Sequence, residues 1–518
     1  MISVKSEFGM NRNLNRRNFI KTAVLGTTGL AFPGCVGTSV RLSVPATKTK
    51  RPNLIYVFAD QLGYIHCGYA GSKKARTPNI DRLAFAAVNF CNAVSNMPVC
   101  SAYRASLFTG KYPTTTGMVI NELRMNTNHE CFGHVLTRAG YQTVYIGKWH
   151  LYANQLGNHH DPKNSYVPPG PDQLGFNGYW AAYNFHHNYY NTYYHTDSTK
   201  KISYGKGVYE PDAQTEMAAS FLQNTAKSGK PFALFLSYGT PHDPWSDNNV
   251  PRKYRDMFKD ARFPNPPNYK GNNDKYADAW GRLSTEQGNK LEYWRRNYYA
   301  MVANLDWNIG RLLDAVEKAG IGDNTIIVFT SDHGEMFGAQ GRRAKNIFYE
   351  EAARVPFLIR WPKHIPAGTV SDACLGTVDI MPTILSLMGL PVPDHVEGMA
   401  LAHCALGKKG PEPKAAFLQN TGACAAWENG HEWRALRDKQ YTYAKYRLDK
   451  SELLFDNVAD PYQMTNLARQ PRHRNTMARF RKVLADKMKS LNDNFQQCTW
   501  YRDNWTDGNR NILRGAKG

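Results

Sequence analysis

Four apolar runs constrain the fold of this chain more than any other feature, because polar residues follow each of them directly. The runs are Asn53–Ala59, Gln142–Ile146, Pro231–Tyr238 and Asn324–Thr330, and helical patterns lie between them. Apolar runs that alternate with helical segments are typical of a parallel sheet covered on both faces. We therefore expect an α/β fold, with a large mixed, mostly parallel sheet sandwiched by helices.

The residues that follow these runs are types that bind metal ions or transfer protons. In open α/β sheets the ligand crevice lies at the carboxyl ends of the strands, so we expect these side chains to share one polar crevice. Taken singly, Asp60 could be a helix cap and His242 a hydrogen-bonded turn histidine. The whole set comprises Asp60 and Gln61, Lys148 and His150, His242, and Asp332 and His333.

The first 48 residues are predicted to be an export signal and linker. Arg16-Arg17 precedes a short, weakly apolar run, Thr22–Phe32, which resembles a twin-arginine export signal. Gly34-Cys35 resembles a lipoprotein cleavage site, so a lipid anchor through Cys35 is an open alternative. We expect a periplasmic protein that could be membrane-anchored, whereas the simpler interpretation is a disordered basic tail.

Beyond this segment the pattern predicts two domains. Residues 49–390 hold the sheet and its helices, including a helix at Tyr299–Lys318 with one apolar face. Residues 391–518 are predicted to form a smaller α+β subdomain with antiparallel strands and a terminal helix. The apolar face of that helix would be Met477, Phe480, Leu484, Met488 and Leu491.

The composition narrows the classes of partner. The formal net charge of +21 favours polyanionic partners, but no zinc finger, basic zipper or RNA-binding signature accompanies it, so we expect no nucleic acid. No apolar stretch is long enough to span a membrane.

The nine cysteines are scattered, which argues against a disulfide framework and a CxxC metal cluster. A lone cysteine such as Cys100 is usually a small buried hydrophobe.

Cys100 lies in a motif that changes this interpretation. The stretch Cys100–Arg104 followed by Ala105–Gly110 resembles the modification and nucleophile signature of the type I, formylglycine-dependent sulfatases of the alkaline phosphatase superfamily. Other family landmarks are resembled, in order, by Thr77–Leu83, Gly147–His150, Ser331–Gly334, Glu452–Asp456 and Asp460–Tyr462. The resemblance implies an alkaline phosphatase-like fold and hydrolysis of sulfate esters.

The resemblance also implies the cofactors. Cys100 would be oxidised to formylglycine, whose hydrate attacks sulfur with one hydroxyl and expels sulfate with the other. Asp60, Gln61, the modified Cys100, Asp332 and His333 would bind one divalent cation. Oxygen ligands favour Ca²⁺. Gln61 replaces the commoner aspartate and His333 the commoner asparagine, so Mg²⁺, Mn²⁺ or zinc stay open.

The remaining catalytic residues follow from the same resemblance. Arg104 would steady the nucleophile, and Lys148 and Lys345 would hold the sulfate, although exposed lysines are the ordinary alternative. His242 is predicted to protonate the leaving alcohol, and His150 to position the diol or to help the elimination step. A helix amino terminus at Cys100 would independently favour an anionic nucleophile and a bound sulfate.

Maturation would require a formylglycine-generating enzyme as a partner. Ala102 stands where the common signature has proline, which leaves the maturation route open. Twin-arginine export carries folded chains, so the conversion of Cys100 could be completed before export.

Export and positive charge favour a sulfated polysaccharide or its oligosaccharides as substrate. The predicted aromatic and basic rim comprises Phe185–His195, His159, His160, Trp245, Arg342 and Arg343; an irregular solvated insertion is the alternative. Two other functions stay open, a phosphonate or phosphate ester hydrolase of the same superfamily and a non-catalytic glycan-binding protein.

Overall fold

The structure is a computed structural model that describes residues 51–152, 161–271, 274–504 and 513–514. The predicted export signal with Arg16 and Arg17, the predicted anchor Cys35, and the rim histidines His159 and His160 lie outside the described residues. All the described residues belong to one compact unit. Among the described helices, none has the length and apolarity that crossing a bilayer requires.

The four apolar runs form neighbouring parallel strands at the centre of an eight-stranded sheet. They are β1 (Asn53–Asp60), β4 (Gln142–Lys148), β8 (Phe232–Pro241) and β9 (Thr325–Ser331). The strand order is β11-β2-β10-β9-β1-β8-β4-β5. Val57 of β1 pairs with Leu236 of β8 on one side and with Phe329 of β9 on the other. The carboxyl ends of these four strands therefore meet at one edge of the sheet.

The outer strands make the sheet mixed, as predicted. β10 (Phe357–Arg360) runs antiparallel to both β9 and β2 (Val88–Phe90), whereas β11 (Thr369–Ser371) is parallel to β2. At the other edge, β5 (Trp180–Tyr183) is parallel to β4.

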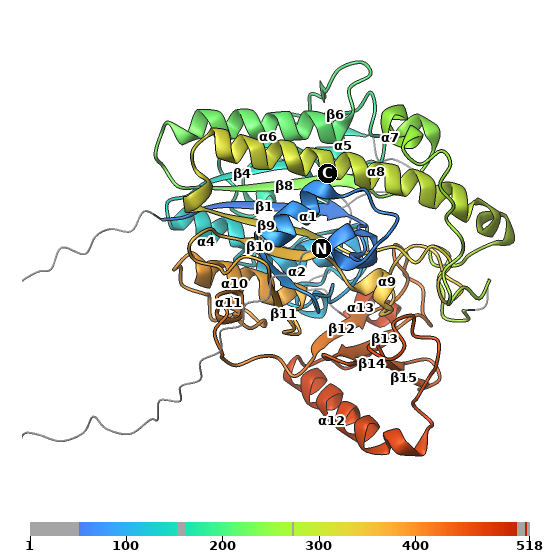
Figure 1. Cartoon of the computed structure of the whole chain (residues 1–518). Coiled ribbons are helices and arrows are strands. Elements are labelled where there is room, and N and C mark those ends of the chain that lie inside the picture. The colour runs from blue at the N-terminus through green and yellow to red at the C-terminus, as the bar shows by residue number, and fades with distance from the viewer. Residues whose placement is uncertain (1–50, 153–160, 272–273, 505–512, 515–518) are drawn as a thin grey trace, which may run out of the picture. The chain divides into compact units, whose positions relative to one another are not determined.

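Helices cover both faces of this sheet (Figure 1). Successive side chains of a strand point to opposite faces. Ile55 and Val57 accordingly pack with α1 (Pro78–Phe85), α6 (Glu210–Ala226) and α8 (Thr285–Lys318). Tyr56 and Phe58 pack with α2 (Cys100–Thr109), α4 (Phe132–Arg138) and α10 (Ile380–Leu387) on the other face.

Helix α8 begins at Thr285, much earlier than the predicted Tyr299. Ser284 caps it, because its Oγ accepts a hydrogen bond from the Gln287 N–H at 3.2 Å while Gln287 Oε1 accepts from the Ser284 N–H at 2.9 Å. The first turns are largely exposed, so they lack the apolar periodicity on which the prediction depended. The predicted apolar face from Val302 to Val316 is buried.

The carboxyl-terminal part contains the predicted antiparallel strands and terminal helix. β12 (Ala416–Asn420), β13 (Trp433–Arg437), β14 (Tyr441–Tyr446) and β15 (Glu452–Asp456) form one sheet in sequence order. α12 (Arg474–Ser490) buries Met477, Phe480 and Leu484 against it. The remaining elements are α3 (Pro113–Thr116), β3 (Leu123–Arg124), α5 (Pro162–Ser165), β6 (Tyr193–Tyr194), β7 (Ile202–Ser203), α7 (Arg252–Asp256), α9 (Glu350–Ala353), α11 (Ala402–Ala405), α13 (Cys498–Asn504) and β16 (Leu513–Arg514).

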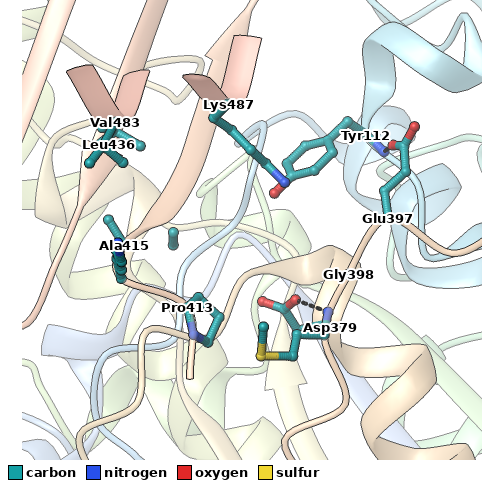
Figure 2. A pocket seen from close by; sticks show the side chains of 12 residues that line it. Tyr112, Asp379, Glu397, Gly398, Pro413, Ala415, Leu436, Val483 and Lys487 are labelled. Carbon is teal, nitrogen blue, oxygen red and sulfur yellow. Dashed lines mark hydrogen bonds between the residues drawn. The ribbon is translucent and has the colours of Figure 1, made fainter. Parts of the chain in front are cut away.

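The carboxyl-terminal sheet and α12 lie beside the segment that follows α2. Figure 2 shows the cavity of about 370 Å³ between them. Glu397 Oε2 accepts a hydrogen bond from the Tyr112 N–H at 2.7 Å, and Lys487 of α12 lies 4.7 Å from the centroid of the Tyr112 ring. The Glu397 N–H donates to the Gly110 carbonyl, which follows the last turn of α2. The helix that begins with Cys100 is thus held at its far end by later parts of the chain.

Candidate active site

The ends of the four central strands bring the predicted site residues together. Asp60 and Lys148 are the last residues of β1 and β4, and Asp332 and His242 follow β9 and β8 directly. The strands approach closely at Gly147, whose φ is 107° and where an added Cβ would lie 1.9 Å from the Ser237 carbonyl oxygen. Only glycine allows β4 to deliver Lys148 in this way.

Cys100 lies at the first turn of α2 and points into this group. Its Sγ is 3.6 Å from Asp60 Oδ1 and 3.2 Å from His333 Nε2. Burial alone would raise the pKa of the Cys100 thiol, but Lys148, Lys345 and His333 together lower it well below its usual value. Position 100 is therefore a place where a negative charge is stabilised.

Asp60, Cys100, Asp332 and His333 form a cluster that fits a divalent cation. Their four ligand atoms lie within 4.8 Å of one another, and all four residues are buried. His333 Nδ1 donates a hydrogen bond to the Gly334 carbonyl at 3.0 Å, so Nε2 is the ring nitrogen that faces the cluster. Asp332 Oδ2 is buried and has no hydrogen-bond partner among the described residues.

The two carboxylates are held by different neighbours. Asp332 Oδ1 accepts hydrogen bonds from the Gln61 and His333 N–H groups, each at 2.9 Å. Burial and the charge of Asp60 raise the pKa of Asp332. Burial also opposes the charge of Asp60, but Lys148, whose Nζ lies 2.5 Å from Asp60 Oδ2, helps to lower its pKa. A cation would relieve the repulsion between these carboxylates.

Arg104 lies beneath the cluster and is fully buried. Its Nη1 donates hydrogen bonds to the Lys148 carbonyl at 2.6 Å and to Ser237 Oγ at 2.8 Å. Its Nη2 lies 3.5 Å from Asp60 Oδ2 and 3.6 Å from Asp332 Oδ2. The guanidinium therefore fixes the end of β4 while it balances the charge of both carboxylates.

Gln61, Lys345 and His242 lie in a row beside the cluster. Lys345 Nζ donates to Gln61 Oε1 at 2.6 Å and lies 2.5 Å from His242 Nε2. His242 Nδ1 lies 3.0 Å from Asp243 Oδ1. Burial and Lys345 oppose a charged imidazole, yet Asp243 and Asp60 outweigh them and raise the pKa of His242 to about 9. Protons are therefore available here at neutral pH.

Two further histidines approach the cluster as neutral rings. Burial, with the charge of Lys148, lowers the pKa of His150 to about 3, and the His150 ring centroid lies 4.4 Å from that of Phe185. The His187 ring stacks on His242 with centroids 3.9 Å apart and an interplanar angle of 4°. Burial and His242 lower the pKa of His187 well below its usual value.

A cavity of about 280 Å³ opens above Cys100. Its lining includes Cys100, His150, His242 and Lys345 from the predicted site and Phe185, His187 and Arg343 from the predicted rim. All the predicted catalytic and metal-binding residues thus lie at one end of the sheet. Gln61 reaches Lys345 and Glu335, and its direct contact with a metal stays a prediction.

Most of the predicted rim lies elsewhere, since Phe185, His187 and Arg343 are its only described residues that line this cavity. Tyr189 and His195 are buried inside the fold, as are Trp245 and Arg342. Trp245 is buried, its Nε1–H donates to the Pro241 carbonyl at 2.8 Å, and its ring packs on Phe337. Arg342 is 1% exposed and pairs with Asp274 at 2.9 Å. Both residues have a structural role, because the polar group of each is bonded to another residue inside the fold.

Among the residues near the cavity that the sequence-based prediction missed are Glu335, Asp243 and Trp280. Glu335 accepts a hydrogen bond from Gln61 Nε2 at 2.7 Å, and Asp243 pairs with His242. Both follow predicted residues closely in the chain, and that spacing could have revealed them. Trp280, which also lines the cavity, lies in a loop without any comparable signal.

Comparisons with known proteins agree with this arrangement. The Sulfatase family model matches residues 52–390, and the model of the N-sulphoglucosamine sulphohydrolase C-terminal region matches residues 338–490. The Ulvan-active sulfatase of Formosa agariphila is 36% identical over 457 residues, which are 87% of this chain and 84% of that protein.

Solved structures are similar over most of their length. The yidJ sulfatase of Bacteroides fragilis has a TM-score of 0.76 and 29% identity, covering 86% of this chain and 97% of that chain. A structure in complex with its substrate, D-glucosamine-2-N,6-O-disulfate, has a TM-score of 0.71 and 27% identity, covering 86% and 99%. A phosphonate monoester hydrolase of Agrobacterium radiobacter is 23% identical, with a TM-score of 0.66, and shows the fold alone.

The family model covers the whole central sheet and the cluster around Cys100. With this match and the 36% identical relative, the chain belongs to the sulfatase family, sulfate ester hydrolases of the alkaline phosphatase superfamily, as its motifs predicted.

Proposed function

We propose that this protein removes sulfate groups from a sulfated polysaccharide or its oligosaccharides, with position 100 as the nucleophile. The observation that carries the proposal is the place of Cys100, at the first turn of α2 between two buried carboxylates and the lysines Lys148 and Lys345. Similar proteins act on ulvan and on a sulfated glucosamine, which supports a carbohydrate substrate.

The family implies a metal ion and a formylglycine, and the residues present fit both. Asp60, Asp332 and His333 would hold the cation, with Gln61 as a further oxygen ligand. We propose Ca²⁺, because carboxylate and amide oxygens suit a hard cation, with Mg²⁺ or Mn²⁺ as alternatives. When bound, the cation supplies positive charge that favours a deprotonated hydroxyl at position 100. Formylglycine formed from Cys100 supplies that hydroxyl as part of a hydrated aldehyde.

Each of the side chains around the cavity then has its own role in the reaction. Lys148 and Lys345 bind sulfate oxygens and stabilise the charge that gathers on them as the bond between sulfur and the leaving oxygen breaks. His242 donates a proton to that leaving oxygen, so the sugar departs as an alcohol. His150 is neutral and orients the hydroxyls at position 100, while Arg104 keeps Lys148 and both carboxylates in place. Water is consumed and sulfate is released overall.

Three further expectations belong to this proposal. The chain is exported by its twin-arginine-like segment to the periplasm, with membrane anchoring through Cys35 as an alternative. A formylglycine-generating enzyme matures Cys100 although Ala102 replaces proline, and Ala102 packs against Met97, Val99 and Cys424 inside the fold. The catalytic domain comprises residues 49–390, and residues 391–518 form the smaller subdomain.

The decisive experiment is coexpression with a formylglycine-generating enzyme, followed by mass spectrometry of the Cys100 peptide and a screen of defined sulfated sugars. We expect sulfate release in proportion to the converted fraction. A preference for phosphate diesters by orders of magnitude would instead favour the phosphonate or phosphate ester hydrolase. Binding of glycans without any turnover by the converted protein would favour the non-catalytic alternative.

A further inference from the structure

Trp280 and Arg343 line the same wall of the cavity above Cys100. The Trp280 side chain is 41% exposed, although large aromatic side chains are usually buried. No aromatic or cation–π contact within the described part of the chain involves its indole ring. A flat apolar face is therefore presented to whatever occupies the cavity.

The loop that carries Trp280 is held firmly against the segment that carries Arg343. The Arg343 N–H donates to the Gly281 carbonyl at 3.0 Å, and Arg282 forms an antiparallel bridge with Arg342. An added Cβ at Gly281 would lie 2.6 Å from Arg342 Nη2, so glycine is needed for the buried guanidinium to pack beside the loop. These contacts fix Trp280 and Arg343 as neighbours.

Asp278 and Asp274 reinforce the same loop. Asp278 Oδ1 accepts from the Gly281 N–H at 2.6 Å, and its Oδ2 accepts from the Cys424 N–H at 2.6 Å. Asp274 forms an ion pair with Arg342, and the Asp274 side chain is only 9% exposed. Both acidic groups of this loop thus already form bonds within the fold, so the loop is ordered before a ligand binds.

Arg343, in contrast, is paired with neither Asp274 nor Asp278. Its side chain takes part in no ion pair among the described residues, and its Nε is buried without a hydrogen-bond partner there. The charge of Arg343 helps to lower the pKa of Asp243, but Asp243 Oδ1 is already paired with His242 Nδ1 at 3.0 Å. A partly buried guanidinium whose acidic neighbour is already paired keeps donors for a further oxyanion, which indicates that a ligand binds it.

We propose that Trp280 and Arg343 form a subsite for the sugar unit next to the sulfated one, and that this subsite selects a unit carrying an oxyanion. The inference rests on the proposed function, because it takes the scissile sulfate to lie between Lys148 and Lys345. Trp280 stacks on the apolar face of the sugar ring. The guanidinium fork of Arg343 binds a carboxylate or a second sulfate, since both present oxygens that match its two donors.

Binding to the protein with unmodified Cys100 tests the subsite without turnover. The probes are three sulfated disaccharides that differ only in the neighbouring unit, which is a uronate, its carboxyl-reduced form, or a sulfated neutral sugar. Calorimetry should show that the wild type prefers one or both anionic probes by about 10- to 100-fold, as expected for a hydrogen-bonded charge. The preferred probe identifies the oxyanion.

In Arg343→Ala this preference should fall to nearly one, and Arg343→Lys should retain part of it because the charge remains without the fork. Trp280→Ala should weaken binding of all three disaccharides by roughly 2- to 10-fold, the value of an aromatic stacking contact. Arg252→Ala, at an 85% exposed side chain on α7, should keep the preference. Circular dichroism verifies that each variant is folded.

An absent preference in the wild type, or an intact preference in folded Arg343→Ala, would overturn the subsite. Failure of the proposed function has a different signature, which is the absence of sulfate release by protein whose Cys100 has been converted. The two results are independent, because one measures Kd on unconverted protein and the other measures turnover.

Discussion

Replacing Glu335 by glutamine tests how the site is assembled, because the change keeps the shape of the side chain and alters only its hydrogen-bond donors and its charge. Glu335 Oε2 accepts from Gln61 Nε2 at 2.7 Å, and its Oε1 accepts from the Phe337 and Ala344 N–H groups at 3.1 and 2.7 Å. Gln61 Oε1 in turn accepts from Lys345 Nζ at 2.6 Å. The carboxylate of Glu335 can only accept hydrogen bonds. It therefore fixes the orientation of the Gln61 amide, and with it the direction of the hydrogen bond between Gln61 and Lys345.

In Glu335→Gln the new amide oxygen can still accept from the two backbone N–H groups, but its NH₂ then faces the NH₂ of Gln61. If Gln61 turns its amide to avoid this, its NH₂ faces the ammonium of Lys345 instead. One hydrogen bond to a charged group is lost in either case, at a cost of about 1.5–3 kcal/mol. Because Lys345 is proposed to bind the transferring sulfate, we expect kcat/KM to fall roughly 10- to 100-fold.

The assay is sulfate release from a small aryl sulfate by protein of measured formylglycine content, together with thermal unfolding. Glu351→Gln is the matched control, since Glu351 is equally buried and burial raises its pKa to about 7, but its hydrogen bond goes to Asn268. We expect the control to keep its kcat/KM. Equal losses in both variants, or none in Glu335→Gln, would refute the idea that Glu335 positions Lys345 through Gln61.

Four other outcomes follow from the same geometry. Cys100→Ala should abolish ester hydrolysis and leave the circular dichroism spectrum nearly unchanged; retained activity would mean that another group is the nucleophile. Chelation should lower both Tm and activity, with recovery on adding Ca²⁺, since a ligand at a hundredfold excess over its Kd stabilises by about 2.7 kcal/mol; an unchanged Tm would argue against the cluster as a cation site. In Asp243→Asn the carboxylate that favours charged His242 is gone, so the loss of kcat/KM at high pH, expected near pH 9 in the wild type, should begin about one pH unit lower. Glu397→Ala should destabilise the protein by about 1–3 kcal/mol through lost hydrogen bonds to Tyr112 and Thr115, without changing the KM of the folded enzyme.

The central sheet and the cluster were predictable because their signal is local in the chain. Each buried strand is a continuous apolar run, and Asp60, Lys148, His242 and Asp332 end or follow these runs directly. Parallel neighbours must bring such residues to one edge. The alternation of Ile55 and Val57 with Tyr56 and Phe58 then determines which helices cover which face.

The rest could not be predicted, because it depends on contacts between distant segments. Arg342 and Arg343 are adjacent and identical in type, yet one is buried by Asp274 and the other faces the cavity. Trp245 was predicted for the rim but lies in the core, whereas Trp280, which no signal in the sequence indicated, lines the cavity. Composition and spacing do not distinguish such pairs.

The cluster also explains why α2 is buried along its whole length. A charged nucleophile gains most from the N–H groups of a helix amino terminus when water is excluded, and that requires the helix to be enclosed. All residues from Cys100 to Thr109 are buried, which leaves the end near Gly110 as the place where the helix can be held from outside. Glu397, from the segment just beyond the central sheet, holds that end, and Lys487 of α12 lies over the neighbouring Tyr112 (Figure 2). Residues far beyond the cluster around Cys100 thus help to hold the helix that presents it.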